Sequence, residues 1–234
     1  MKATIQRSTL DDGLKPYNWT KFVQPGWLLS GGHRRCVLCG DHAGDIAMCD
    51  GCCADLPWRD RPWQKRLAGI DTIVACFEFG YPIRELLHRA KYGRDIAIAC
   101  LLGELFVTRL RMLGHTPARP VALFPVPMAR RRLLVRGYNQ AIAIAEPISS
   151  VFSIPIDVVS IYKRRGLPPQ SKLDAASRRT NIRRAFIARG QPGVDSAIVI
   201  DDVITTGATV QAMARTLRAA GVRNVHVWAL AAVA

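Results

Sequence analysis

The stretch that decides the fold is residues 197–209, which read Ala-Ile-Val-Ile-Asp-Asp-Val-Ile-Thr-Thr-Gly-Ala-Thr. Its apolar first half predicts a buried strand, with Ser196 to Ile200 as the clearest strand candidate in the chain, and residues 208–220 have helical spacing. In open α/β sheets, ligands bind beyond the carboxyl ends of the strands. The stretch therefore places two carboxylates and a small, hydroxyl-rich loop where a ligand is expected.

This loop has the chemistry of a phosphate site beside a sugar site. Free N–H groups at a helix start attract an anion, and a glycine lets the backbone approach it closely. Two carboxylates would repel a phosphate, so they suit ribose hydroxyls, or a Mg²⁺ bound through the sugar or a diphosphate. The alternative is an ordinary strand-to-helix turn with a solvated acid pair. The candidate binding residues are Thr205, Thr206, Gly207, Ala208 and Thr209, beside the acids Asp201 and Asp202.

The rest of the chain predicts strands that alternate with helices. The expected strands are 70–79, 121–126, 156–162 and 225–233, and the expected helices are 83–91, 96–113 and one from Asn139. Pro147 should interrupt or end that last helix, because proline lacks the N–H that a helix interior needs. This order predicts an α/β fold with a largely parallel sheet flanked by helices.

Four cysteines near the N-terminus have the spacing of a metal site. Cys36-x₂-Cys39 and Cys49-x₂-Cys52 form two thiolate pairs, as in tetrahedral zinc sites. Four thiolates leave no open position, so this zinc would be structural and the segment a small zinc-ribbon-like module. The alternatives are a redox pair or free thiols, and Cys53, His33 or His42 in place of one ligand.

The chain is expected to have three parts: a loosely attached segment 1–30, a cysteine module 31–62 and an α/β domain 63–234. No apolar run approaches the ~18 residues of a membrane span, and the N-terminus lacks the apolar stretch of a secretory signal. Seven cysteines, an odd number, suit a reducing compartment. We therefore expect a soluble, cytoplasmic protein.

Basic residues are in large excess and clustered. Lys and Arg number 33 against 18 Asp and Glu, for a net charge of +15, which favours polyanionic partners such as nucleic acid or phosphorylated metabolites. One cluster is Arg130, Arg131, Arg132 and Arg136, and a second spans residues 163–184, with eight basic residues and one acid. A solvated basic surface without a partner is the alternative.

Several further strings resemble those of one known family. Phe124-Pro-Val-Pro127, Arg131-Arg132 and Arg136-Gly-Tyr-Asn-Gln140 look like the central motif of the ComF/GntX family, within the type I phosphoribosyltransferase superfamily. Residues 197–209 resemble the signature of that superfamily. Further matches are Lys91-Tyr92-Gly93 and the later string of Arg165, Gln170, Leu173, Arg178, Asn181 and Ala185-Phe186. The resemblance covers about residues 30–234.

The resemblance implies a phosphoribosyltransferase-type sheet and a ligand, phosphoribosyl diphosphate with Mg²⁺. Val126 and Pro127 would belong to the diphosphate loop, with the N–H groups of residues 126–128 near the leaving group. Arg131, Arg132 and Arg136 would neutralise the diphosphate. Asp201 and Asp202 would be the catalytic pair, holding the ribose hydroxyls and stabilising positive charge. Residues 163–184 would be a flap, with Arg165, Lys172 and Arg178 as flap or nucleic-acid contacts.

Two functions follow as hypotheses. In the first, the protein transfers phosphoribosyl to an acceptor and releases diphosphate, in natural competence and DNA uptake. In the second, it is a non-catalytic accessory protein of transformation that binds phosphoribosyl diphosphate or single-stranded DNA, which the basic clusters favour. A purely structural zinc protein would leave residues 197–209 unexplained. The sequence names neither the acceptor nor the oligomeric state.

Overall fold

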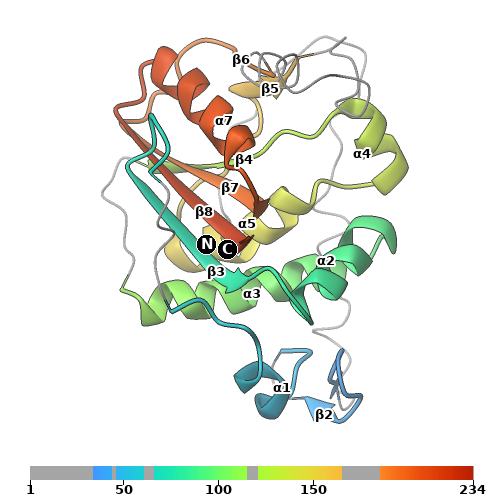
Figure 1. The fold of residues 1–234 in the computed structure, drawn as a ribbon. Helices are drawn as coiled ribbons and strands as arrows, with labels where there is room; N and C mark the ends of the chain where they lie inside the picture. Colours follow the sequence, from blue (N-terminus) through green and yellow to red (C-terminus); the bar gives the residue numbers. More distant parts are fainter. Residues whose placement is uncertain (1–33, 44–45, 61–65, 115–120, 165–184, 234) are drawn as a thin grey trace. The chain divides into compact units, whose positions relative to one another are not determined.

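The computed structural model describes residues 34–43, 46–60, 66–114, 121–164 and 185–233. These residues form two compact units that divide after Asp55. The smaller unit holds the four cysteines of the predicted metal site, and the larger unit holds the residues from Leu56 onward (Figure 1).

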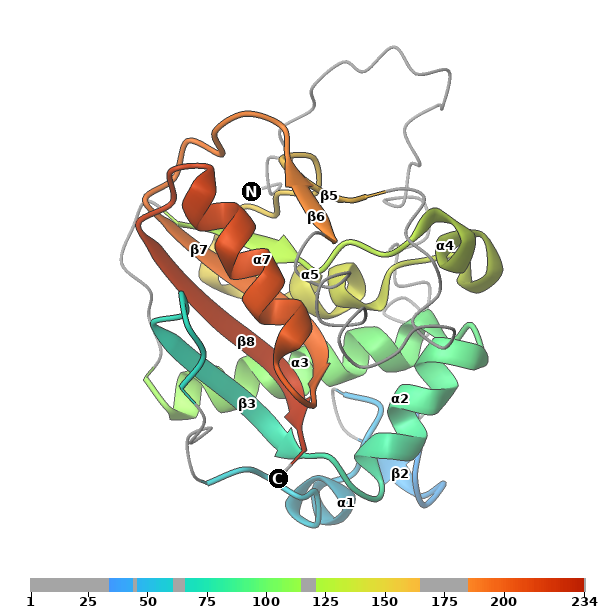
Figure 2. The same cartoon turned by 45° about the horizontal axis from the view of Figure 1, so that its top comes forward.

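Four parallel strands form the sheet of the larger unit (Figures 1 and 2). Their order is β3 (Thr72–Glu78), β8 (Asn224–Ala232), β7 (Ser196–Ile204) and β4 (Val121–Pro125), and each neighbouring pair is parallel. Most residues of β4, β7 and β8 are buried, as expected when helices cover both faces of a parallel sheet. The predicted α/β fold with a parallel sheet is confirmed.

Helices lie on both faces of this sheet, as the two views show (Figures 1 and 2). α3 (Ile96–Met112) and α5 (Gln140–Phe152) pack together on one face, and α2 (Ile83–Tyr92) packs against α3. α7 (Ala208–Ala219) covers the other face, where its buried side chains join those of β7 and β8 in one apolar core. Burial of these apolar surfaces is the main stabilising term of the unit.

Two short elements complete the larger unit. α4 (Arg130–Arg136) follows β4 and has no buried residue. β5 (Ile161–Lys163) and β6 (Phe186–Ala188) form an antiparallel pair. The predicted strand at 156–162 is therefore shorter and later than expected. Asp157 explains the difference, because its side chain accepts hydrogen bonds from the N–H groups of Val159 and Ser160 and turns the chain there.

β7 is longer than the predicted strand 196–200, because β8 keeps pairing with it. Asp201 lies opposite Ala229 and Ile204 lies opposite Ala232, so the strand continues four residues beyond Ile200. β4 ends earlier, at Pro125 opposite Ile200. The two acids therefore lie within the last part of a strand, and not in the loop that follows it.

The predicted interruption of the helix at Pro147 is wrong. α5 runs from Gln140 to Phe152 through Pro147. Gly103 of α3 lies directly against this region, where an added Cβ would be 2.7 Å from the Ile144 carbonyl oxygen and 3.1 Å from Pro147 Cγ. Close packing between α3 and α5 thus stabilises a helix that the missing N–H weakens.

Residues just after the cysteines pack with the larger unit. The N–H of Arg59 donates to the Cys76 carbonyl, and the N–H of Glu78 donates to the Pro57 carbonyl. The Arg59 guanidinium also lies 2.5 Å from a Glu78 carboxylate oxygen. The segment from Leu56 thus extends beside β3 and belongs to the larger unit, whereas the expected boundary of the cysteine module is at residue 62.

The smaller unit contains three short elements: β1 (Arg34–Arg35), β2 (His42–Ala43) and α1 (Asp50–Ala54). β1 and β2 are antiparallel. Cys49 caps α1, because its Sγ accepts a hydrogen bond from the N–H of Cys52. In the described part of the chain, none of the helices has the length and apolar composition that crossing a membrane requires.

Glu146 of the larger unit has a buried carboxyl oxygen that lacks a hydrogen-bond partner among the described residues. The Oε2 atom of Glu146, on α5, has no hydrogen-bond donor, and burial raises the pKa of this group to about 7. The folded state therefore binds more protons than the unfolded state between the ordinary pKa of 4.5 and about 7. Because of this difference, the free energy of unfolding falls as pH rises through that window.

We predict that Glu146→Gln stabilises the protein at pH 8, by up to about 3 kcal/mol, and has little effect near pH 4.5. Urea unfolding of both proteins across this range measures the difference. Glu85→Gln is a contrasting control: Arg84 lowers the pKa of that carboxyl, so its removal should not stabilise at pH 8. Unfolding free energies of Glu146→Gln and parent that differ equally at all pH values would contradict the prediction.

Candidate functional site

The predicted site residues gather where β4 and β7 end. Pro125 pairs with Ile200, and the N–H of Val126 donates to the Ile200 carbonyl at 2.9 Å. The loop after β4 therefore starts directly beside Asp201. Parallel pairing alone brings these two segments together, although they are far apart in the sequence.

Gly207 forms the turn between β7 and α7. It has a left-handed backbone conformation, with φ of 76°, and an added Cβ would collide with the Leu67 side chain. No side chain caps α7. The Ala208 N–H donates only a long hydrogen bond, of 3.4 Å, to Thr206 Oγ1. Thr205 and Thr206 are exposed, and Ala208 and Thr209 are partly buried. The start of α7 thus presents N–H and hydroxyl donors to a ligand, as an anion site requires.

Asp202 is buried, and both of its carboxylate oxygens are bound by other groups of the chain. The Lys91 Nζ lies 2.6 Å from its Oδ2, and the Gln140 Nε2 donates to the same oxygen at 3.1 Å. Its Oδ1 accepts the N–H of Val203 at 2.8 Å. Burial works to raise the pKa of Asp202, but the Lys91 ammonium and these donors outweigh it and hold the pKa below its ordinary value. Asp202 is therefore an ionised, oriented carboxylate.

Asp201 has a different environment. It is partly buried, and its Oδ1 accepts the N–H of Asp202 at 2.9 Å. Burial, and then the neighbouring charge of Asp202, raise the pKa of Asp201 well above its ordinary value. Lys163 of β5 lies near enough for its pKa to respond to both Asp201 and Arg132, although burial is the larger effect and lowers it. Lys91 acts on both acids, but it is in direct contact with Asp202.

The Arg-Gly-Tyr-Asn-Gln string connects the elements around the site. The Tyr138 hydroxyl donates to the carbonyls of Ala90 at 2.6 Å and Asp95 at 3.2 Å, so it ties this string to the end of α2. Asn139 caps α5 through its Oδ1, which accepts the N–H of Ala141, and its Nδ2 donates to the Val126 carbonyl at 3.0 Å. One asparagine therefore fixes both the start of α5 and the loop after β4.

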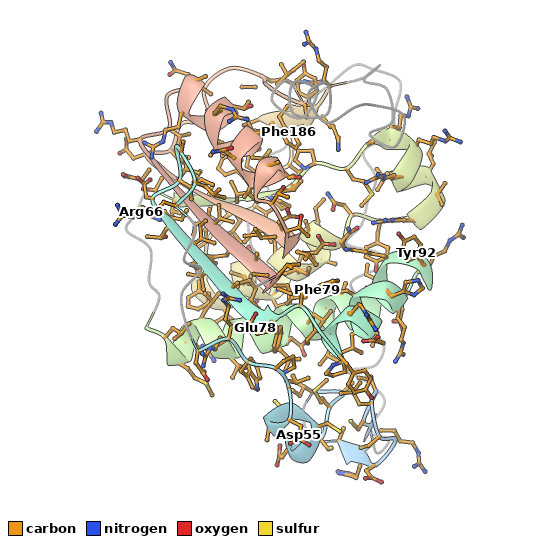
Figure 3. All side chains as sticks on the ribbon, viewed as in Figure 1. Asp55, Arg66, Glu78, Phe79, Tyr92 and Phe186 are labelled. Atoms are coloured by element: carbon orange, nitrogen blue, oxygen red, sulfur yellow. The ribbon has the colours of Figure 1, made fainter. Side chains whose placement is uncertain are left out.

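The three predicted arginines differ in their surroundings. Arg131 and Arg132 are exposed on α4. Arg136 is partly buried: it donates to Gln140 Oε1 at 3.2 Å, and its guanidinium lies 5.2 Å from the centre of the Tyr92 ring. Figure 3 shows Tyr92 at the end of α2, beside α4. Arg131 and Arg132 have the freedom to meet a ligand, whereas Arg136 already has partners.

The predicted N–H donors of residues 126–128 need a correction. The N–H of Val126 is used by the Ile200 carbonyl, and Pro127 has no N–H. Of these three residues, Met128 is the one that has an N–H with no backbone acceptor among the described residues. The reason is that the N–H of Val126, the last residue of the predicted strand 121–126, is already used in pairing with β7.

The four predicted metal-ligand cysteines of the smaller unit come together. The Sγ atoms of Cys36, Cys39, Cys49 and Cys52 all lie within 4.8 Å of one another. Cys39 and Cys49 have their sulfurs 3.6 Å apart. Tetrahedral zinc with bonds of about 2.3 Å would place sulfurs about 3.8 Å apart. The cluster can therefore hold a metal such as zinc, and it contains Cys52, not the adjacent Cys53 or the exposed His42.

The electrostatics of these thiols fit a cation. Burial opposes ionisation of Cys36, but the N–H groups of Cys39, Cys49 and Leu38 outweigh it and lower the pKa of Cys36 to about 6. The pKa of Cys52 is raised, first by its hydrogen bonds with Cys39 and Cys49, because the sulfurs share protons. A divalent cation would let all four ionise together.

Some predicted residues lie outside the described residues: Arg165, Lys172 and Arg178 of the expected flap, and His33. Lys91 and Gln140, which contact Asp202, were not predicted as site residues, because they stood out only as members of the family strings. Lys163 stood out only as a member of a basic cluster. Periodicity cannot pair Lys91 with an acid in a distant strand. The signal that pointed to Lys91 and Gln140 was the resemblance of their two strings to those of the family.

We predict that Asn139→Ala destabilises the protein by about 2 kcal/mol, because it removes both a helix cap and the bond to the Val126 carbonyl. Asn139→Ser keeps a capping oxygen and should cost about half as much. Thermal or urea unfolding measures both. Asn224→Ala, which loses one 3.3 Å side-chain bond, is the control and should change stability by about 0.5 kcal/mol or less. Equal losses at positions 139 and 224 would contradict the assigned role.

Comparison with known proteins gives related sequences over most of the chain. A family described as the phosphoribosyl transferase domain matches residues 139–234. Competence protein F of Haemophilus influenzae is 32% identical over 167 residues, which cover 69% of this chain and 72% of that protein. DNA utilization protein YhgH of Salmonella typhi is 29% identical over 83% of this chain and 82% of its own length. Competence protein ComFC of Bacillus subtilis is 27% identical over 78% and 70%, respectively.

The matched domain begins at Asn139 and includes the acid pair and the α7 turn. The similarity to competence protein F extends over more than two thirds of both chains. On these grounds the chain belongs to the ComF family of the type I phosphoribosyltransferase superfamily.

Proposed function

We propose that this protein binds phosphoribosyl diphosphate with Mg²⁺ and transfers the phosphoribosyl group to an acceptor, with release of diphosphate. The observation that carries the proposal is the meeting of two loops at one sheet edge. The uncapped start of α7 lies at the end of β7, and the loop after β4 starts beside Asp201 on the same strand. A phosphate, a ribose and a diphosphate are what these three adjacent features would bind.

Each feature has a role in this proposal. The ribose 5-phosphate would bind at Thr205, Thr206, Gly207, Ala208 and Thr209, where N–H groups and hydroxyls supply donors. The acid pair would meet the ribose hydroxyls. The diphosphate would bind at the loop that contains Val126 and Pro127. Arg131 and Arg132, exposed on the helix α4 that follows this loop, would approach the diphosphate.

The reaction breaks the bond between the anomeric carbon and a diphosphate oxygen, and the electron pair leaves with the diphosphate. The acceptor supplies the pair for the new bond to the same carbon. Positive charge develops on the ribose between these events, so a nearby carboxylate lowers the barrier. When bound, Mg²⁺ would neutralise diphosphate charge and make it a better leaving group.

Single-stranded DNA binding is the second candidate. It is favoured by an exposed aromatic residue, Tyr92, which is 66% exposed and has the Arg136 guanidinium 5.2 Å from the centre of its ring. Bases stack on such rings, and nearby arginines meet the phosphates. The names of the relatives, DNA utilization protein and competence protein, agree with a role near DNA. This candidate explains the basic surface but not the α7 turn.

We predict that calorimetry detects binding of Mg²⁺–phosphoribosyl diphosphate to the parent protein and that Gly207→Ala abolishes it, because a side chain at this position would displace the turn that binds the phosphate. Gly193→Ala is the matched control: Gly193 also has a positive φ, of 71°, but lies in open space. Gly193→Ala should lose about 1 kcal/mol of stability. Gly207→Ala should lose more, because its Cβ also collides with Leu67, and only Gly207→Ala should lose the ligand.

The result that would refute the proposal is an absence of binding to the folded parent protein. Tight binding of single-stranded DNA in that case, weakening steeply as salt is raised, would instead support the second candidate. Binding without diphosphate release, across a panel of bases and amines, would favour a ligand-binding protein over a transferase.

We also propose that the four-cysteine cluster binds structural zinc. All four ligands would be thiolates, so the ion would have no open position for catalysis. The ion would stabilise the fold of the smaller unit. The described part of this unit has only a small apolar core, formed by Cys36, Ala43 and Met48.

We predict that the purified protein contains about one zinc per chain and that Cys52→Ser loses it, whereas Cys53→Ser keeps it. The two positions are adjacent on α1, so the comparison isolates membership of the cluster. Elemental analysis of the purified variants measures the metal. Loss of zinc from both variants, or from neither, would contradict the assignment of Cys52.

A further inference from the structure

The segment of residues 66–71, which leads into β3, lies beside α7 (Figures 1 and 2). At the start of α7, a Cβ added to Gly207 would be 2.3 Å from Leu67 Cδ1 and 3.2 Å from its Cδ2, so the Leu67 side chain fills the space beside this turn. Farther along the helix, a Cβ added to Gly69 would be 4.0 Å from Ala214 Cβ. We call residues 66–71 the 66–71 segment.

Arg218, in the last turn of α7, fixes the other end of this segment. Its Nη2 donates to both carboxylate oxygens of Asp71, at 2.8 and 3.0 Å, and its Nε donates to the Gly69 carbonyl at 3.2 Å. Asp71 also exchanges two hydrogen bonds with Val225 of β8, of 2.7 and 2.8 Å. Because the segment is tied to both α7 and β8, Leu67 is held at the turn by more than its own packing.

The start of α7 needs support that does not use its N–H groups. No side chain caps this helix, and helices without a cap fray at their first turn. A capping oxygen would stabilise the turn, but it would also occupy donors that a phosphate requires. Leu67 is apolar and contacts the turn at Gly207. It can therefore support the start of α7 and leave the donors available.

The conformation of Gly207 makes this contact important. Gly207 is buried and has a φ of 76°. Glycine permits this conformation but also permits many others, so the surrounding contacts decide whether the turn stays in place. Leu67 is partly buried and packs against the apolar core that α7 shares with β7 and β8. Its side chain thus links the turn to the core.

We propose that Leu67 is a positioning residue for phosphate binding: its side chain holds the Gly207 turn in the conformation that directs the uncapped N–H groups of α7 at the ligand. This inference rests on the proposed function and adds to it a residue far from the 197–209 string. Leu67 acts through the turn and does not touch the ligand. Its loss would leave every donor present but less well oriented, and the affinity would fall for that reason.

The test is a double-mutant cycle between positions 67 and 207, measured by calorimetric titration with Mg²⁺–phosphoribosyl diphosphate. Leu67→Ala should weaken binding about tenfold, and Leu67→Met, which refills most of the space, less than about threefold. Gly207→Ala should abolish binding, because its Cβ meets Leu67. Leu67→Ala/Gly207→Ala removes this collision and should bind within about tenfold of Leu67→Ala, the remaining loss being the strain of alanine at a positive φ.

Val194→Ala is the matched control. It also removes methyl groups that pack against the same core, but Val194 precedes β7, at the end opposite Gly207. It should lower the midpoint of thermal unfolding, as Leu67→Ala does, and change the affinity less than about twofold. Val194→Ala/Gly207→Ala should remain unable to bind. If Gly207→Ala does not fold, the affinities of Leu67→Ala, Leu67→Met and Val194→Ala still decide whether Leu67 positions the site.

Three results would overturn the inference alone. Parent-like affinity of Leu67→Ala would mean that its contact with the turn serves only stability. Equal losses of affinity in Leu67→Ala and Val194→Ala would mean that any damage to the core weakens binding. Failure of the folded double variant to bind better than Gly207→Ala would mean that Leu67 is not what opposes a side chain at position 207. Absence of binding to the folded parent is a different failure, since it refutes the proposed function and the inference with it.

Discussion

Pairing of β7 with β4 on one side and β8 on the other is the constraint on which the larger unit depends. β8 continues the pairing to Ile204, whereas β4 stops at Pro125. This difference leaves the last residues of β7 unpaired on the β4 side and puts the loop after β4 beside Asp201. The pairing of β7 with β4 and with β8 therefore positions the acid pair, the α7 turn and the basic helix α4. Sheet register therefore sets the geometry of the site.

The acid pair shows how one strand can give two neighbouring identical side chains different chemistry. The pKa of Asp202 is lowered because Lys91 and two N–H donors favour its charged form over the cost of burial. The pKa of Asp201 is raised because burial and the charge of Asp202 oppose ionisation. Asp202 has Lys91 of α2 and Gln140 of α5 as partners, whereas the Asp201 carboxylate accepts the N–H of Asp202.

The fold shows which contacts the residues of the Arg-Gly-Tyr-Asn-Gln string make. Tyr138 ties the α4–α5 connection to the end of α2, Asn139 joins the α5 cap to the loop after β4, and Gln140 contacts Asp202. Three consecutive residues thus link three parts of the site. Their spacing in the sequence indicates nothing about these partners, because each contact is made across elements that are distant along the chain.

The sequence by itself determined the elements whose signals are local: the apolar strands, most helices, the glycine turn before α7 and the two cysteine pairs. It overestimated the effect of Pro147, since packing against Gly103 supports α5, and it missed the continuation of β7, which pairing with β8 imposes. Only the tertiary structure joined Lys91 to Asp202 and showed that the pKa values of the two acids shift in opposite directions. Strand pairing and helix packing bring such residues together, and neither leaves a local pattern in the chain.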